Sequence, residues 1–207
     1  MAGPLPSLVG AAAGYLGHRG GLGETRTKKD EMTSNADHAD AGNRILGSLG
    51  SADGTGVVRM EDRFDTAIDD LWSALTDPHR LAHWYGQVEG DLRLGGAFRA
   101  RVLSSGWEGS GRAEECEPPR RLLLVKKNDR LSYELVTEVT LAAEGERTLL
   151  AFEERGMPLD QLAAYGAGNQ VHVEDLAAYL AGRERCDADT RWKELLPAYE
   201  TLAADVG

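Results

Sequence analysis

Cysteine is scarce in this chain: Cys116 and Cys186 are the only two among 207 residues. They lie far apart and lack the spacing of a metal site, so the sequence predicts neither a disulfide framework nor a metal centre. A reduced, cytoplasmic protein is the expectation from this cysteine usage. The glycine-rich stretch Gly17–Gly23 follows no strand, which argues against a phosphate loop, and we expect no cofactor.

Positive charge and long apolar runs are also lacking. Lys and Arg number 23 against 34 Asp and Glu, for a net charge of −11. Such a chain repels phosphate backbones and anionic lipid surfaces, so we expect neither a nucleic-acid nor a membrane partner. No apolar run is long enough to cross a bilayer, and no basic segment precedes Leu5–Leu16 as it would in a signal peptide. Hydrophobic residues at 42% and charged residues at 28% indicate a globular protein with a sizeable core.

The N-terminal segment differs in composition from the rest. Residues 1–43 are rich in small and polar residues without helical or strand periodicity, so we expect a disordered extension before a domain at 44–207. Met32 follows Lys28-Lys29-Asp30-Glu31, whose codons would resemble a bacterial ribosome-binding site. We therefore hypothesise that Met32 is the native start and that residues 1–31 are not native. An endogenous peptide spanning 20–31, seen by mass spectrometry, would refute this.

Regular patterns begin at Arg44. Asp53-Gly54 predicts a hairpin between strands at Arg44–Leu49 and Gly56–Phe64. Thr66 is the expected N-cap of an amphipathic helix whose apolar residues are Ile68, Leu71, Trp72 and Leu75. Asp77-Pro78 then predicts a second short helix, with Asp77 as its N-cap.

Alternating residues predict a run of antiparallel strands, which we place at Asp91–Val102 (bent at Gly95-Gly96), Trp107–Cys116, Arg121–Lys127, Leu131–Leu141 and Thr148–Glu154. Helices follow at Pro158–Tyr165, Asn169–Ala181 and Arg191–Ala204, with a kink or restart at Pro197. We interpret Gly166 and Gly168 as a hinge at the start of the helix that carries His172. Segregated strands and helices indicate an α+β fold, in which a C-terminal helix must cover the apolar face of the sheet.

Six segments in this order carry a family resemblance. They are Val58-Arg59-Met60-Glu61-Asp62-Arg63, Leu71–Pro78, Leu81–Trp84, Gly90–Phe98, Glu117–Leu122 and Tyr165-Gly166-Ala167-Gly168. Together they resemble the START/birch-pollen-allergen-like (SRPBCC) superfamily over roughly residues 44–203. The branch they are most similar to is the C-terminal domain of the Aha-type activator of the heat-shock-protein-90 ATPase. The resemblance implies a helix-grip fold, in which a curved antiparallel sheet wraps around a long C-terminal helix and two short helices follow the first strands. Relatives often have Trp after Gly-Ala-Gly, whereas Asn169 stands there and would open or polarise the mouth of a cavity.

A helix-grip fold places some side chains between helix and sheet. We expect an apolar or aromatic ligand to contact Trp84, Phe98, Trp107, Tyr133, Phe152, Tyr165, Asn169 and His172. Ordinary core packing is the plainer explanation of most of the aromatic residues among them. His172 could be a polar handle or a general base, but a helical His near a glycine turn more often caps or packs, so we assign no catalytic residue.

Other charged residues have plainer interpretations. Glu153 and Glu154 are adjacent on a strand, so only one of them would face the cavity. Arg120-Arg121 and Lys126-Lys127 are interpreted as solvated strand ends.

Two functions from different classes remain open. One is a non-catalytic domain that sequesters or carries a small hydrophobic ligand. The other is a protein-interaction module like the chaperone-activator domain. Cyclase-like chemistry is a third and weaker alternative, because no acid–base constellation is apparent. A void at Phe98, Trp107, Tyr165 and His172 would favour ligand binding, and a filled interior with an exposed apolar patch would favour a protein partner.

Overall fold

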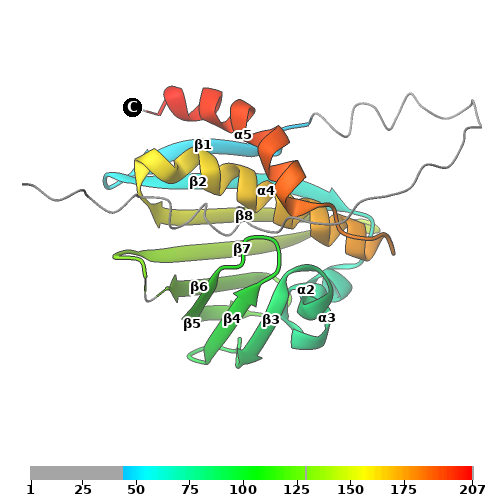
Figure 1. Cartoon of the computed structure of the whole chain (residues 1–207). Coiled ribbons are helices and arrows are strands. Elements are labelled where there is room, and N and C mark those ends of the chain that lie inside the picture. The colour runs from blue at the N-terminus through cyan, green and yellow to red at the C-terminus, as the bar shows by residue number, and fades with distance from the viewer. Residues whose placement is uncertain (1–43, 129, 207) are drawn as a thin grey trace, which may run out of the picture.

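The structure is a computed structural model that describes residues 44–128 and 130–206. The expectations for residues 1–43 lie outside the described residues. Eight antiparallel strands form one sheet in the order β1-β2-β8-β7-β6-β5-β4-β3 (Figure 1). The strands are β1 Gly47–Ala52, β2 Thr55–Phe64, β3 Gly86–Gly90, β4 Ala97–Val102, β5 Glu108–Glu117, β6 Arg121–Lys127, β7 Glu134–Glu144 and β8 Arg147–Met157. The helices are α2 Ile68–Thr76, α3 Pro78–Trp84, the 3-10 turn η2 Leu159–Gln161, α4 Leu162–Leu180 and α5 Ala188–Ala204.

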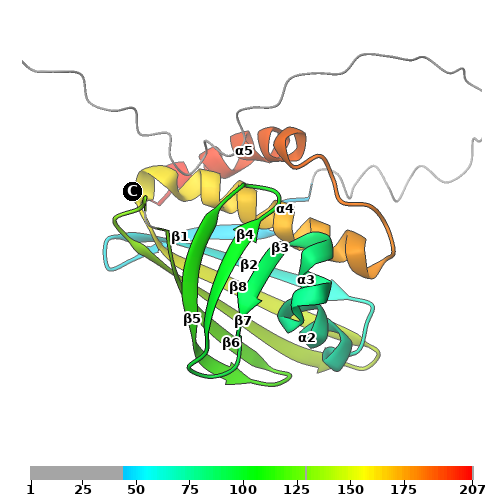
Figure 2. The same cartoon turned by 60° about the horizontal axis from the view of Figure 1, so that its bottom comes forward.

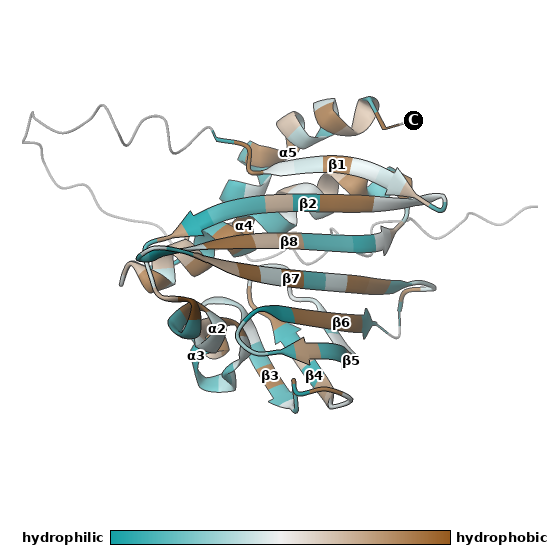
Figure 3. Ribbon diagram, turned by 180° about the vertical axis from the view of Figure 1, so that it is seen from behind, coloured by the Kyte–Doolittle hydropathy of each residue, from teal (hydrophilic) through white to brown (hydrophobic). Residues whose placement is uncertain are grey.

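The sheet is curved, and α4 lies across its concave side (Figure 2). α2 and α3 close one end of this space, while α5 packs on the side of α4 that faces away from the sheet (Figure 2). Single strands such as β7 and β8 change between hydrophilic and hydrophobic residues along their length (Figure 3). In β4, and in β7 as far as Leu141, every second residue is buried, as expected for an antiparallel sheet with one covered side. The predicted α+β helix-grip fold is confirmed.

The first turns of the domain follow their sequence signals. Asp53 and Gly54 both have positive φ, at 52° and 78°, and join β1 to β2 as the Asp-Gly pair predicted. Asp77 caps α3 by accepting a hydrogen bond from the His79 N–H. The predicted cap of α2 is wrong, because its N-cap is Ala67 and the Thr66 hydroxyl instead donates to Asp70 Oδ2.

The predicted strand at Asp91–Val102 is too long at its start. The chain enters β4 only at Ala97, and a separate strand, β3, precedes it at Gly86–Gly90. Gly90 is the last residue of β3. It has φ 114°, and a Cβ there would lie 2.3 Å from the Ala97 carbonyl oxygen, so the close β3–β4 approach requires glycine.

The predicted hinge at Gly166 and Gly168 is also wrong, because α4 runs without a break from Leu162 to Leu180. Gly166 does not bend α4 but allows another helix to pack against it. A Cβ on Gly166 would lie 2.4 Å from Cδ1 of Tyr199, so its absence lets α5 approach α4 closely. A Cβ on Gly168 would meet nothing within 4 Å. α5 likewise continues through Pro197 and does not restart there.

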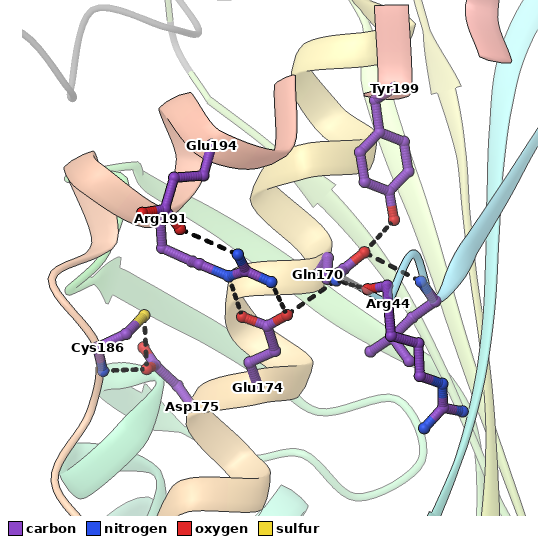
Figure 4. A network of polar contacts seen from close by, with 9 residues as sticks. Arg44, Gln170, Glu174, Asp175, Cys186, Arg191, Glu194 and Tyr199 are labelled. Carbon is purple, nitrogen blue, oxygen red and sulfur yellow. Dashed lines mark hydrogen bonds and ion pairs between the residues drawn. The ribbon is translucent and has the colours of Figure 1, made fainter. Parts of the chain in front are cut away.

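A buried polar network fixes α4 against β1 and α5 (Figure 4). Gln170, which is fully buried, accepts hydrogen bonds from the Tyr199 hydroxyl (2.7 Å) and the Leu46 N–H (3.0 Å). Its amide nitrogen donates to the Arg44 carbonyl (2.7 Å) and to Glu174 (2.8 Å), and Glu174 also accepts two hydrogen bonds from the Arg191 guanidinium. All four hydrogen-bonding positions of the Gln170 amide are thus satisfied.

Candidate functional site

A cavity of about 200 Å³ lies between the concave face of the sheet and α4. Leu75, Leu81 and Tyr85 from the α2–α3 region close one end, and inward residues of β4, β6, β7 and β8 form the floor. Of the eight residues predicted to contact a ligand, seven line this cavity: Trp84, Phe98, Trp107, Phe152, Tyr165, Asn169 and His172. These seven side chains therefore lie where a ligand in the cavity would contact them, and their role in binding stays a prediction.

Tyr133, the eighth predicted residue, is not among the residues that line the cavity. Its hydroxyl group lies 3.0 Å from the Tyr165 hydroxyl and donates to Gln161 Oε1 at 2.9 Å. Burial and the hydrogen bond with Tyr133 raise the pKa of Tyr165, so both phenols stay neutral. Tyr133 thus lies outside the cavity wall and contacts Tyr165, which is part of the wall, through its hydroxyl group.

Two glycines of β5 make room for aromatic rings in this wall. A Cβ on Gly111 would lie 2.5 Å from the ring of Phe98, and one on Gly109 would lie 2.4 Å from the ring of Trp107. Both rings therefore rest against bare backbone. The pattern Trp107-Glu-Gly-Ser-Gly111 lets large apolar surfaces line the cavity while leaving its interior open.

An ion pair is buried in this otherwise apolar cavity. Lys126 of β6 and Glu154 of β8 are 2.7 Å apart, with side chains 12% and 3% exposed. The same Glu154 oxygen accepts a hydrogen bond from the Thr137 hydroxyl at 2.8 Å, and the other accepts one from the Asn169 amide at 3.0 Å. Three groups on two strands and α4 thus converge on one carboxylate.

This arrangement keeps both members of the pair charged. Burial alone would raise the pKa of Glu154, but the Lys126 ammonium and the three hydrogen bonds bring it below its ordinary value. Burial alone would lower the pKa of Lys126, and Glu154 raises it above its ordinary value. A protonated lysine is a hydrogen-bond donor and an electrostatic group, and it is not a nucleophile.

His172 of α4 faces the same cavity. Its Nδ1 lies 3.1 Å from the Ser104 hydroxyl, and its ring lies 5.4 Å from that of Tyr85 at a tilt of 59°. Burial, with help from the positive charge of Lys126, lowers the pKa of His172 to about 4. The imidazole is therefore neutral at pH 7 and links α4 to the β4–β5 turn.

The interpretation of Lys126 as part of a solvated strand end is wrong, whereas Lys127 beside it is exposed as expected. The signal was present in the sequence: Leu122, Leu124 and Lys126 share one face of β6 at period 2, so an inward Leu face implies an inward lysine. Strand alternation also decides between the two glutamates. Glu154 faces the cavity and Glu153 pairs with Arg59 and Arg155 on the other face.

Metal-binding clusters and membrane-spanning helices are both absent from the part of the chain that the structure describes. Between residues 44 and 206, Asp129 aside, no group of three or more His, Cys, Asp or Glu side chains is placed to hold a metal ion. Over the same residues, no helix has both the length and the apolar character needed to cross a bilayer.

Comparison with known families and structures gives a consistent result. The profile of the family described as "Activator of Hsp90 ATPase homolog 1-like protein" matches residues 65–181, which is more than half of the chain. The crystal structure of CalU16 from Micromonospora echinospora is similar with a TM-score of 0.65 and 27% identity, over 76% of this chain and 97% of that one.

Two further structures extend the comparison. DynU16, described as a protein in the dynemicin biosynthetic locus, has a TM-score of 0.58 and 28% identity over 63% of this chain and 50% of its own. EF2215 from Enterococcus faecalis, a protein of unknown function, shares the fold at a TM-score of 0.60 and 16% identity, over 82% of this chain and 99% of its own. No curated protein shows significant similarity to the chain.

Proposed function

The chain belongs to the activator of Hsp90 ATPase homolog 1-like family, and from that premise and the shape of its cavity we propose that it binds a small hydrophobic or aromatic molecule between the sheet and α4. The observation that carries this proposal is the cavity of about 200 Å³, walled by aromatic and aliphatic side chains. A filled interior would have argued for function at the surface, since it leaves a ligand nowhere to bind.

The dimensions of the cavity suit a molecule of one or two rings. An engineered apolar cavity of about 150 Å³ in another protein takes up benzene. Burial of apolar ligand surface contributes roughly 25 cal/mol per Å². Offset or edge-on contacts with the rings of Trp84, Phe98, Trp107 and Phe152 would add to this. The likeness to DynU16 supports a ligand that is a biosynthetic small molecule.

A protein-interaction role receives less support. Within residues 44–128 and 130–206, three large apolar side chains are exposed: Leu94 before β4, Leu103 after β4 and Leu159 in η2. Leu94 and Leu103 lie at opposite ends of a strand, and Leu159 lies in a third segment. Scattered apolar residues of this kind are normal on protein surfaces and do not indicate a docking site.

Ligand binding is tested by native mass spectrometry of protein purified from its own host, followed by titration of the protein with naphthalene and related two-ring compounds. We expect a co-purifying small molecule, and a change in Trp fluorescence on titration because Trp84 and Trp107 line the cavity. Protein that carries no co-purifying small molecule, and whose Trp fluorescence does not change with any probe, would refute the proposal.

A matched pair of variants locates the binding site. Gly168→Leu places a side chain into the open space beside α4, so it should weaken probe binding at least about tenfold. Ala82→Leu adds the same side chain at an exposed position of α3 and should leave binding unchanged. Equal effects of the two variants would place the probe elsewhere.

A further inference from the structure

The cavity contains hydrogen-bond donors that the protein itself leaves unused. The Lys126 ammonium has three N–H donors, and among residues 44–128 and 130–206 only Glu154 accepts from it. The indole Nε1–H of Trp107 is buried without any acceptor in the same part of the chain. The Tyr85 side chain is also on the cavity wall, and its hydroxyl makes no hydrogen bond to the described residues.

These donors belong to one region of the cavity. The Lys126 Nζ lies 6.0 Å from the centre of the Trp107 ring, within reach of a cation–π interaction. Lys126 also interacts electrostatically with Tyr85, and Tyr85 packs on His172. Buried donors of this kind carry a penalty unless an acceptor reaches them. The part of the cavity around Lys126 therefore has the chemistry to receive an oxygen atom.

The charge of the pair restricts which oxygen fits. Lys126 and Glu154 together are neutral, and His172 is neutral at pH 7. A bound carboxylate would add a second negative charge beside Glu154 in a buried site, where an uncompensated charge is costly. A carbonyl oxygen accepts the same hydrogen bonds and brings no charge.

We infer that the cavity recognises aromatic molecules that carry an uncharged carbonyl group, with the carbonyl oxygen accepting a hydrogen bond from the Lys126 ammonium. This inference rests on the proposed function and deepens it by naming the chemical class of the ligand. Glu154 acts as a positioning residue: Thr137 and Asn169 hold its carboxylate, and the carboxylate holds the lysine. The walls select a flat apolar body, and Lys126 selects the oxygen.

Three matched probes test the inference by calorimetric titration. They share the naphthalene ring and differ in one substituent: naphthalene itself, 2-acetylnaphthalene and 2-naphthoate. A hydrogen bond from a charged donor is a strong one, so we expect the ketone to bind about tenfold more tightly than naphthalene. We expect the carboxylate to bind no better than naphthalene.

A pair of double variants assigns the preference to the ion pair. Lys126→Met with Glu154→Gln removes both charges together, which avoids a lone buried charge, and should abolish the ketone preference while naphthalene still binds. Lys127→Met with Glu153→Gln makes the same changes on the outer face of the sheet and should keep the preference. The carbonyl stretching frequency of 2-acetylnaphthalene bound to the unaltered protein is a second readout that needs no variant. We expect it to fall below its value in hydrocarbon solvent.

The outcomes separate the inference from the function beneath it. If none of the three probes binds, the proposed function fails. If naphthalene and the ketone bind equally, if the carboxylate binds best, or if the inner double variant keeps the ketone preference, the cavity binds ligands but the carbonyl inference is overturned. An unshifted carbonyl frequency would overturn it as well.

Discussion

Two faces of α4 bury polar side chains in opposite ways. Gln170 faces β1 and α5, and each of its four hydrogen-bonding positions has a partner in the protein. Asn169, one residue earlier, faces the cavity and donates to Glu154, whose partner Lys126 keeps unused donors. The Gln170 amide has no position left for a further partner, while the inner face has hydrogen-bond donors that a ligand could use.

The glycines of α4 repeat this contrast. Gly166 lies directly against Tyr199, and Gly168 borders open space. A helix held rigidly on one side can leave a void on the other without collapsing into it, because the outer contacts already determine its position. We conclude that the outer network supplies much of the support for α4, while the inner face keeps two polar contacts, from Asn169 and His172, and leaves space beside them for binding.

The largest expected effect comes from breaking the inner pair on one side. Lys126→Met leaves Glu154 as a buried charge without its partner, which should lower the free energy of unfolding at pH 7 by about 3–5 kcal/mol. Urea denaturation measures this change. The loss should shrink in acid, because the unpaired carboxylate has a raised pKa and takes up a proton within the folded state.

Lys127→Met is the matched control for that variant. Its side chain is exposed on the neighbouring position of β6, so its effect should stay within about 0.5 kcal/mol. Equal stability losses for the two lysine variants would mean that Lys126 is not buried beside Glu154.

The second effect concerns acidification of the inner face. The pKa of His172 is about 4 in the folded protein, mainly because of burial, against 6.5 for the free side chain. The unfolded chain therefore binds a proton at a higher pH than the folded chain. The stability from neutral His172 is fully present above pH 6.5 and is lost as the pH falls toward 4, by on the order of 3 kcal/mol. Denaturation midpoints from pH 7 to 5 measure this slope.

His172→Gln should flatten this slope, since glutamine does not titrate. The control is His83→Gln, because His83 is exposed on α3 and stacks on Tyr179. It should leave the slope unchanged. A slope that survives in His172→Gln would assign the acid sensitivity to other groups.

Much of this arrangement could be predicted from local sequence patterns, and the exceptions share a physical cause. Period-2 alternation shows that Phe98 shares a face with Ala100 and Val102, and the helix-grip resemblance turns that face toward the cavity, which Phe98, Trp107 and Phe152 do line. The partners of a buried charge depend on strand pairing: Lys126 and Glu154 lie 28 residues apart and meet only across β7. The role of Gly166 likewise depends on α5, which returns 33 residues later with Tyr199. From the local sequence alone, Gly166 suggests a hinge. Only the contact with the Tyr199 ring shows that it is a packing site.

The smallest expected effect compares those two glycines directly, and the expected changes have opposite signs. Gly166→Ala forces a Cβ to within 2.4 Å of Tyr199, so α5 must shift at a cost of about 1–3 kcal/mol of unfolding free energy. Gly168→Ala meets no atom within 4 Å and gains the helix propensity of alanine, which should stabilise the protein by about 0.5–1 kcal/mol. Thermal denaturation of the two variants side by side measures both changes. If both substitutions stabilise the protein, the packing of α5 on Gly166 is looser than described, and if both destabilise it, the space beside Gly168 is not open. Opposite signs from one methyl group two residues apart would establish that α4 has one packed face and one open face.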